Sequence, residues 1–126
     1  MILGIGIDLV DVARARRLLD AKGERVLARL CTEREAAYVR AHPAAAASFA
    51  ARLAAKEAAY KALAGTDEAR AIGWRDIEVE RAADGKPSLL FHGRARTRAA
   101  ALGVSAVHLS MTHTDTSAGA VVILER

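Results

Sequence analysis

The sequence has few of the residues that mark several large classes of protein. It contains one cysteine, Cys31, which cannot form an internal disulfide bond. No apolar run approaches the roughly 18 residues of a membrane-spanning helix, and the N-terminus lacks the basic-then-apolar pattern of a secretory signal peptide. These absences predict a protein of the reducing cytoplasm with no membrane segment, in which Cys31 is a small core residue.

Aromatic residues are also scarce, at 4% of the 126 residues, whereas 52% are hydrophobic and 27% are charged. This composition is typical of a soluble globular protein, and we expect residues 1–126 to form one domain. Proteins that hold single-stranded nucleic acid usually stack its bases on aromatic rings. The scarcity of such rings therefore argues against that function.

Positive charge is concentrated in the N-terminal third of the chain. The formal net charge is +4, and residues 13–40 account for all of it, with eight basic and four acidic side chains. The basic ones are Arg14, Arg16, Arg17, Lys22, Arg25, Arg29, Arg34 and Arg40. A basic face suits an anionic partner, which on charge alone could be nucleic acid, a membrane surface or an acidic protein.

The first ten residues, MILGIGIDLV, have the alternating pattern of a β-strand. Apolar residues at positions 5, 7 and 9 share one face, and Gly4, Gly6 and Asp8 share the other. Glycine within a strand often marks the close approach of a ligand or another backbone. Asp8 is therefore either a turn former at the end of the strand or a ligating carboxylate. The two glycines lack the third glycine of a dinucleotide-binding fingerprint, which excludes that function.

Capping and turn signals divide the rest of the chain into elements. Helices are expected at residues 12–21, 24–30, 33–41 and 94–102, the third opened by a capping-box pattern at Thr32 and Glu35. Pro43 is expected in the first turn of a long central helix that ends near Gly65. After a loop at residues 66–73, strands are expected at 74–80, 88–91, 107–112 and 118–124. Hairpin connections between strands predict an α+β fold with an antiparallel sheet packed on the long central helix.

The most unusual stretch is FAARLAAKEAAYKAL, residues 49–63 of the central helix. Its large apolar residues gather on one stripe, as in an amphipathic helix, yet Lys56 falls inside that stripe and Glu57 lies at its edge. One interpretation is a solvated helix with i, i+4 ion pairs such as Glu57–Lys61, and the helix alone favours it. The other is a functional carboxylate among cations, because burying such charges is costly unless they are used.

Residues with the potential for chemistry occur in three places. Asp8 and Glu57 are carboxylates on different elements, which suit a hard cation such as Mg²⁺ held by few protein ligands, water and phosphate. Lys61 and Arg52 would be positive charges beside such a site and could hold phosphate oxygens. His113 lies at a strand end within SMTHTD, where a structural and a functional role are equally compatible with the pattern.

Several catalytic signatures are absent, namely zinc-binding Cys/His spacing, the GxSxG turn and the P-loop. Covalent nucleophilic catalysis therefore has no support in the sequence. The remaining pattern fits metal-assisted phosphoryl chemistry, in which the protein positions groups and neutralises charge. The spacing of these residues does not identify the substrate.

Four segments, in order along the chain, resemble the holo-acyl-carrier-protein synthase family of small 4′-phosphopantetheinyl transferases. They are GIGIDLVDVARARRL, FAARLAAKEAAYKAL, DGKPSLLF and HLSMTHTDTSAGAVVILE. The resemblance spans almost the whole chain, and its most specific part is the combination of GIGIDxV with RxAAKEAxxKA. It implies the 4′-phosphopantetheinyl transferase fold.

The resemblance implies Mg²⁺-dependent transfer of 4′-phosphopantetheine from coenzyme A (CoA) to a serine of apo-acyl carrier protein, with release of adenosine 3′,5′-bisphosphate. Asp8 and Glu57 would bind Mg²⁺ together with the CoA pyrophosphate, and Lys61 would contact phosphate. Arg14 and Arg17 would dock the acidic carrier protein, in agreement with the charge asymmetry. The family also implies a homotrimer with active sites between subunits, and partners that include neither nucleic acid nor a membrane.

Two further segments acquire roles through the resemblance. Gly85, Lys86 and Pro87 would form part of the nucleotide pocket, and His113 and Thr114 would lie at the CoA site. The base that deprotonates the attacking serine has two candidates, Glu57 acting through a water and Asp115 beside His113. Lys56 either contacts the substrate or reaches a neighbouring subunit.

The chain departs from its relatives at two points. Alanines occupy residues 44–47, where many relatives have basic residues near the CoA 3′-phosphate, so that charge would come from Arg52 or from the arginines of residues 94–98. LAGTDEARAIGW, residues 63–74, replaces a more glycine-rich turn. Two rival functions are a basic nucleic-acid-binding module and a Mg²⁺-dependent phosphodiesterase that would hydrolyse CoA without an acceptor.

Overall fold

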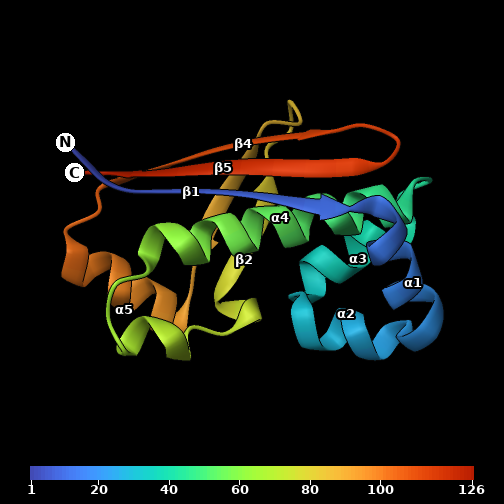
Figure 1. Ribbon diagram of the computed structural model, residues 1–126, viewed down its shortest axis with the longest axis horizontal. Coiled ribbons are helices and arrows are strands. Elements are labelled where there is room, and N and C mark those ends of the chain that lie inside the picture. The colour runs from blue at the N-terminus through green and yellow to red at the C-terminus, as the bar shows by residue number, and fades with distance from the viewer.

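The computed structural model describes all 126 residues. Figure 1 shows a sheet that lies along one side of a long helix, with shorter helices beneath both ends of that helix. The elements in chain order are β1 (Ile2–Asp11), α1 (Val12–Lys22), α2 (Glu24–Leu30), α3 (Glu33–Ala41), α4 (Ala45–Leu63), β2 (Ile77–Arg81), β3 (Pro87–Phe91), α5 (Gly93–Leu102), β4 (Ala106–His113) and β5 (Ser117–Glu125). The predicted α+β fold, with an antiparallel sheet on the long central helix, is confirmed.

Three strands form an antiparallel sheet in the order β1-β5-β4. Asp8 of β1 pairs with Ala120 of β5, which in turn pairs with Met111 of β4. Side chains of paired residues share a face of the sheet, and this row faces α4. Strands β2 and β3 form a separate two-stranded hairpin, which passes behind the sheet in Figure 1 and projects beyond it at the tip.

Strand β1 lies unusually close to α4 because of its two glycines. A β-carbon added to Gly6 would lie 1.7 Å from the carbonyl oxygen of Ala58, and one added to Gly4 would lie 2.2 Å from that of Ala62. The close approach expected from glycines within a strand is therefore an approach of backbone to backbone. It places Asp8, the next residue on the same face, against α4.

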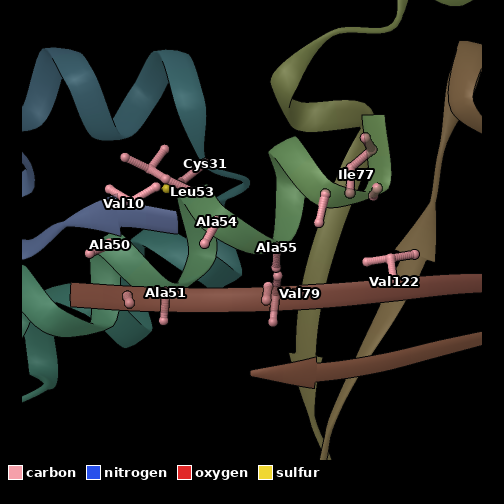
Figure 2. Packing of buried hydrophobic residues seen from close by; sticks show 14 of the residues in the cluster. Val10, Cys31, Ala50, Ala51, Leu53, Ala54, Ala55, Ile77, Val79 and Val122 are labelled. Atoms are coloured by element: carbon pink, nitrogen blue, oxygen red, sulfur yellow. The ribbon is translucent and has the colours of Figure 1, made fainter. Parts of the chain in front are cut away.

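Helix α4 is buried around most of its circumference, so the prediction of a one-sided amphipathic helix is wrong. The sheet covers one side, and α1, α3 and β2 contact the others. Figure 2 shows Ala50, Ala51, Ala54 and Ala55 of α4 within this core, where their small side chains let the surrounding elements approach. Cys31 is buried in the same core, as expected.

The remaining expectations had mixed outcomes. The four shorter helices are confirmed, and Thr32 and Glu35 make both hydrogen bonds of the capping box. Pro43 precedes the first turn of α4, because the ring of His42 accepts a hydrogen bond from the Ala44 amide (3.0 Å) and holds these residues in a turn. The strand expected from residue 74 begins at Ile77, because Trp74–Asp76 form a 3₁₀ turn. Another 3₁₀ turn, Glu68–Ala71, lies within the expected loop.

None of the helices combines the length and the apolar composition that a bilayer crossing requires.

Candidate active site

Asp8 and Lys61 meet where β1 crosses α4. The Lys61 ammonium donates hydrogen bonds to Asp8 Oδ1 (2.9 Å) and to the carbonyl oxygen of Ile7 (3.0 Å). The Asp8 side chain is 19% exposed and that of Lys61 is 52% exposed, so solvent still reaches the pair. The solvated Glu57–Lys61 ion pair considered for the helix is not formed, because Lys61 turns toward β1.

Glu57 lies on α4 with a half-buried side chain. Its carboxylate makes no hydrogen bond or ion pair with the rest of the chain. It lines a cavity of about 240 Å³ beneath the 3₁₀ turns, together with Lys56, Tyr60, Arg70, Ile72, Gly73, Trp74 and Ile77. A carboxylate without a protein partner beside a cavity is available to an external ligand.

Asp8 is bonded to Lys61 and Glu57 precedes Lys61 by one helical turn, and carboxylates of this kind suit a magnesium ion. Asp8 keeps one carboxylate oxygen, Oδ2, without a partner, and both oxygens of Glu57 have none. No group of three or more His, Cys, Asp and Glu side chains is placed to hold a metal. Two carboxylates therefore fit a hard cation that completes its shell with water and substrate phosphate, rather than one held by a cage of protein ligands.

Although Lys56 lines the cavity beside Glu57, its side chain is buried and its ammonium is bound within the fold, so the prediction that it reaches substrate or a neighbouring subunit is wrong. Its side chain is 1% exposed and its ammonium pairs with Glu35 Oε1 at 2.7 Å. The helix periodicity correctly placed Lys56 in the buried stripe. Its partner Glu35, however, lies 21 residues earlier on α3. The periodicity of one helix cannot predict a contact with a residue on another helix.

Arg52 is nearly as buried, at 2% exposure. Its Nη1 donates to Ser48 Oγ (3.0 Å), and its guanidinium carbon lies 4.1 Å from the centre of the Tyr38 ring. Its Nε is buried and has no hydrogen-bond partner. Burial lowers the pKa of the guanidinium from its usual value, although arginine remains charged in proteins.

A second cavity, of about 490 Å³, joins Arg52 to the β2–β3 hairpin. It is lined by Arg34, Glu35, Tyr38, Arg52, Glu78, Val79, Glu80, Arg81, Ala82, Ala83 and Gly85. Arg81 also lies near the Tyr38 ring, 5.6 Å from its centre, and donates to the carbonyl oxygen of Gly85 (2.8 Å). Arg52 and Arg81 form no ion pair, so this cavity contains two uncompensated positive charges.

The acidic side chains of that cavity are already paired. Burial alone would raise the pKa of Glu78, but hydrogen bonds from Arg34, Thr32 and His92 outweigh it and lower the pKa to about 2. Arg34 also binds Glu80 (2.9 Å). Glu78 is therefore a charged structural link between α3 and β2, and its negative charge is offset by its partners.

The hairpin loop contains the three residues expected at the nucleotide pocket. Gly85 has φ of 86°, which favours glycine, and its amide donates to the carbonyl oxygen of Ala82 (2.8 Å). The Lys86 amide donates to Asp84 Oδ1 (3.0 Å), and Lys86 is exposed to solvent. Pro87 begins β3, at a strand position where proline is tolerated.

Comparisons with known proteins identify the family. The family model described as 4′-phosphopantetheinyl transferase superfamily matches residues 4–121. The chain belongs to this superfamily. The holo-[acyl-carrier-protein] synthase of Koribacter versatilis is 46% identical over 125 residues, which cover 99% of each chain. That of Anaeromyxobacter dehalogenans is 50% identical over 128 residues, covering 99% of this chain and 97% of the relative.

Solved structures give the same result. The holo-[acyl-carrier-protein] synthase of Neisseria meningitidis superposes with a TM-score of 0.87 at 30% identity, over the full length of both chains. The Bacillus anthracis enzyme, solved in complex with CoA (3′,5′-ADP), gives a TM-score of 0.78 at 33% identity and covers 98% of this chain and 96% of its own. The resemblance inferred from the four segments is therefore confirmed.

In this phosphopantetheinyl transferase fold, the SMTHTD segment lies at the turn between β4 and β5. His113 is the last residue of β4 and is exposed, as is Asp115 in the turn. Thr114 has a structural role there, because its hydroxyl accepts hydrogen bonds from the amides of Ser117 (3.1 Å) and Thr116 (3.2 Å). His113 and Asp115 make no contact of this kind and remain open to a ligand.

Arg14 and Arg17 lie on the solvent side of α1, one turn apart. Val12 and Ala15 are the buried residues of that helix. Neither arginine forms an ion pair, so both charges are free to meet an anionic partner. Their place on a basic transferase helix agrees with the predicted docking role, which stays a prediction.

A single chain does not gather all the predicted residues into one site. Asp8 and Lys61 meet at the β1–α4 junction, with Glu57 one turn before Lys61 on α4, whereas Arg52 and Gly85 line the other cavity. His113 lies two strands away from Asp8 and two paired residues further along the sheet, in the row of Val10. The set therefore occupies three separate regions of one transferase subunit.

Sequence reasoning missed several residues that line the two cavities. Tyr38 and Arg81 complete the larger one, and Tyr60 and Trp74 complete the smaller one. Tyr60 carried a usable signal, since it follows Glu57 by three residues and helical neighbours at that spacing share a face. Trp74 is the sole tryptophan of the chain, but its place beside α4 depends on tertiary contacts.

Proposed function

We propose that this chain is a holo-[acyl-carrier-protein] synthase that transfers 4′-phosphopantetheine from CoA to a serine of apo-acyl carrier protein. The serine hydroxyl gives its proton to a base and its oxygen forms a bond to the phosphorus of the phosphopantetheine group. The bond from that phosphorus to the oxygen that bridges the two phosphates breaks. Adenosine 3′,5′-bisphosphate leaves. The observation that carries the proposal is the contact between Asp8 and Lys61, with the unpaired Glu57 one helical turn before Lys61, in a chain that belongs to the transferase superfamily.

Asp8 and Glu57 are the proposed ligands of a magnesium ion. When bound, the ion would neutralise charge on the CoA pyrophosphate, which is the usual contribution of a metal to phosphoryl transfer. Lys61 neutralises Asp8 in the free chain, and its half-exposed amine can turn to a phosphate oxygen when substrate enters. We assign Glu57 chiefly as a ligand, because neither of its oxygens has a protein partner that the ion would have to displace.

The nucleotide end of CoA is assigned to the cavity between α3, α4 and the β2–β3 hairpin. The buried, unpaired Nε of Arg52 and the unpaired charge of Arg81 support a phosphate there. These two arginines would replace the basic residues that relatives carry where this chain has alanines at 44–47. Of the alternative arginines, Arg98 instead donates to the carbonyl oxygen of Leu63 (2.8 Å) at the end of α4.

A homotrimer with active sites between subunits is the proposed assembly. Its first support is an exposed apolar face on the outer side of the sheet, where Ile5, Ile7 and Leu9 are 58%, 67% and 74% exposed. Val121 and Ile123 of β5 pair with Ile7 and Ile5 and extend this face. Exposed apolar patches of this kind usually mark an interface. Its second support is the separation of the predicted site residues within one chain, which a neighbouring subunit could bring together.

Arg14 and Arg17 on α1 are the proposed contacts to the acidic carrier protein. Charge complementarity of this kind steers the encounter of the two proteins and fixes their relative orientation.

We further propose that residues 1–126 act as one domain, since both cavities share α4 as a wall. The cytoplasm is the proposed compartment, in keeping with a free thiol at Cys31.

The transfer can be separated from its rivals by product analysis. The chain is incubated with CoA and Mg²⁺, with and without apo-acyl carrier protein, and adenosine 3′,5′-bisphosphate is measured by chromatography. Release that requires the carrier protein supports the transferase. Equal release without the carrier indicates a phosphodiesterase, and no release in either mixture, together with strongly salt-dependent DNA binding, indicates the nucleic-acid-binding module.

A further inference from the structure

The ammonium of Lys56 is completely occupied by partners inside the protein. It donates to Glu35 Oε1 (2.7 Å), to the carbonyl oxygen of Trp74 (2.8 Å) and to the carbonyl oxygen of Ile77. These are all three of its donors. No donor remains for a phosphate or for another subunit, so the charge of Lys56 acts within the fold.

Glu35 extends this link to two more segments. Its Oε1 also accepts from the Thr32 amide (2.9 Å), which closes the capping box of α3. Its Oε2 accepts from the Val79 amide (2.9 Å) in β2. With both side chains about 1% exposed, the pair connects α3, α4, the 3₁₀ turn Trp74–Asp76 and β2 through one charged centre.

Stability alone does not explain a lysine at this position. Replacing a buried ion pair by apolar residues of similar volume is often neutral or stabilising, because two charges must be taken out of water. The carbonyl oxygens of Trp74 and Ile77 are the distinctive partners here. Those two residues form the wall of the cavity that faces Glu57, the residue next to Lys56 on α4.

We propose that Lys56 is a positioning residue for the transfer reaction, which holds the segment from Trp74 to Ile77 against α4 and thereby fixes the cavity beside Glu57. This inference rests on the proposed function for its kinetic consequence, but its structural consequence does not depend on it. Trp74 is the only tryptophan of the chain, so its fluorescence reports the anchored segment directly.

The test uses the double variant Lys56→Met with Glu35→Gln, which removes both buried charges. The glutamine keeps one acceptor oxygen for the Val79 amide, while the Thr32 amide loses its acceptor. We expect far-UV circular dichroism to remain close to that of the parent, and the unfolding temperature to fall modestly, because the carbonyl oxygens of Trp74 and Ile77 lose their donor. Acrylamide quenching of Trp74 fluorescence should increase, because its carbonyl oxygen has lost its anchor. With CoA, Mg²⁺ and carrier protein, kcat should fall about 10- to 100-fold, with little change in the KM for the carrier protein.

The exposed pair Arg40–Glu24 (2.7 Å) provides the matched control. Arg40→Met with Glu24→Gln should change neither Trp74 quenching nor kcat.

If the Lys56 double variant folds poorly, Lys56→Gln in the Glu35→Gln background restores a donor for one carbonyl oxygen. This variant should recover part of the kcat and part of the protection of Trp74 from quenching. A folded Lys56→Met/Glu35→Gln variant with parental quenching and parental kcat overturns the proposal. So does a result in which kcat across the variants follows only their unfolding temperature. If the parent protein itself shows no transfer while quenching still increases in the double variant, the proposed function is refuted and the anchoring role of Lys56 is retained.

Discussion

Replacing Gly6 by alanine should both destabilise the protein and inactivate it. Gly6 lies on the α4 face of β1, two residues before Asp8. The added β-carbon would lie 1.7 Å from the carbonyl oxygen of Ala58 and 2.7 Å from its carbonyl carbon. Both atoms belong to the backbone of a buried helix, so neither can rotate away.

The size of the effect follows from the required displacement. Ordinary contact begins at 3.4 Å, so β1 must retreat from α4 by about 1.7 Å in a close-packed interior. Overpacking costs about 1–3 kcal/mol, and we expect about 3 kcal/mol here, because two backbones collide. For a chain of this length that lowers Tm by roughly 10 °C. Misplacing a catalytic group by 1 Å can cost about 100-fold in rate, and Asp8 would move with the strand.

Thermal unfolding followed by circular dichroism, and transfer activity measured well below the lower Tm, would check both parts. Gly4→Ala should have a smaller effect, since its β-carbon would lie 2.2 Å from the Ala62 carbonyl oxygen and further from Asp8. Gly119→Ala is the stability control, because its one tight contact is with the flexible end of the Leu9 side chain at 3.0 Å, and the Asp8 carbonyl oxygen lies at an ordinary 3.6 Å. A Gly6→Ala protein with parental Tm and activity would refute the backbone contact and its role in placing Asp8.

Three further predictions test separate parts of the site. If Glu57 is chiefly a metal ligand, Glu57→Gln should lose activity that raised Mg²⁺ partly restores, and an unchanged Mg²⁺ dependence with lost turnover would argue against this. Arg14→Glu should raise the apparent KM for the carrier protein more than that for CoA, because the lost charge lies on the proposed docking helix; equal changes in both would count against it. If active sites lie between subunits, inactive Asp8→Asn and His113→Ala chains should regain activity when they are refolded together, and the absence of any recovery would contradict a shared site.

Local signals in the sequence predicted most of the elements. The capping box at Thr32 and Glu35 located the start of α3, and the glycines at positions 4 and 6 indicated a close approach to β1. These features depend on neighbours in sequence or on the allowed backbone conformation, both of which a pattern records. The start of β2 was placed three residues too early, because the carboxylate of Asp76 accepts from the Gly73 amide (2.9 Å) and closes a turn there.

The environment of α4 could not be predicted in the same way. Helical periodicity identified a stripe of large residues, but the alanines outside it are also buried by elements from both ends of the chain. Lys56 lies in an apolar stripe because Glu35 and the carbonyl oxygens of Trp74 and Ile77, all distant in sequence, are its partners. Lys61 similarly bonds to Asp8, 53 residues away, in place of its helical neighbour. Contacts between residues so far apart in sequence produce no periodic pattern from which they could be predicted.

The intact mass of a carrier protein tests the central claim most directly. Apo-acyl carrier protein would be incubated with CoA, Mg²⁺ and this protein, and then measured by mass spectrometry. We predict that the carrier gains the mass of one phosphopantetheinyl group on a serine, and that Asp8→Asn abolishes this gain. An unmodified carrier after incubation with folded protein, or a modified carrier with the Asp8→Asn protein at the parental rate, would contradict the account.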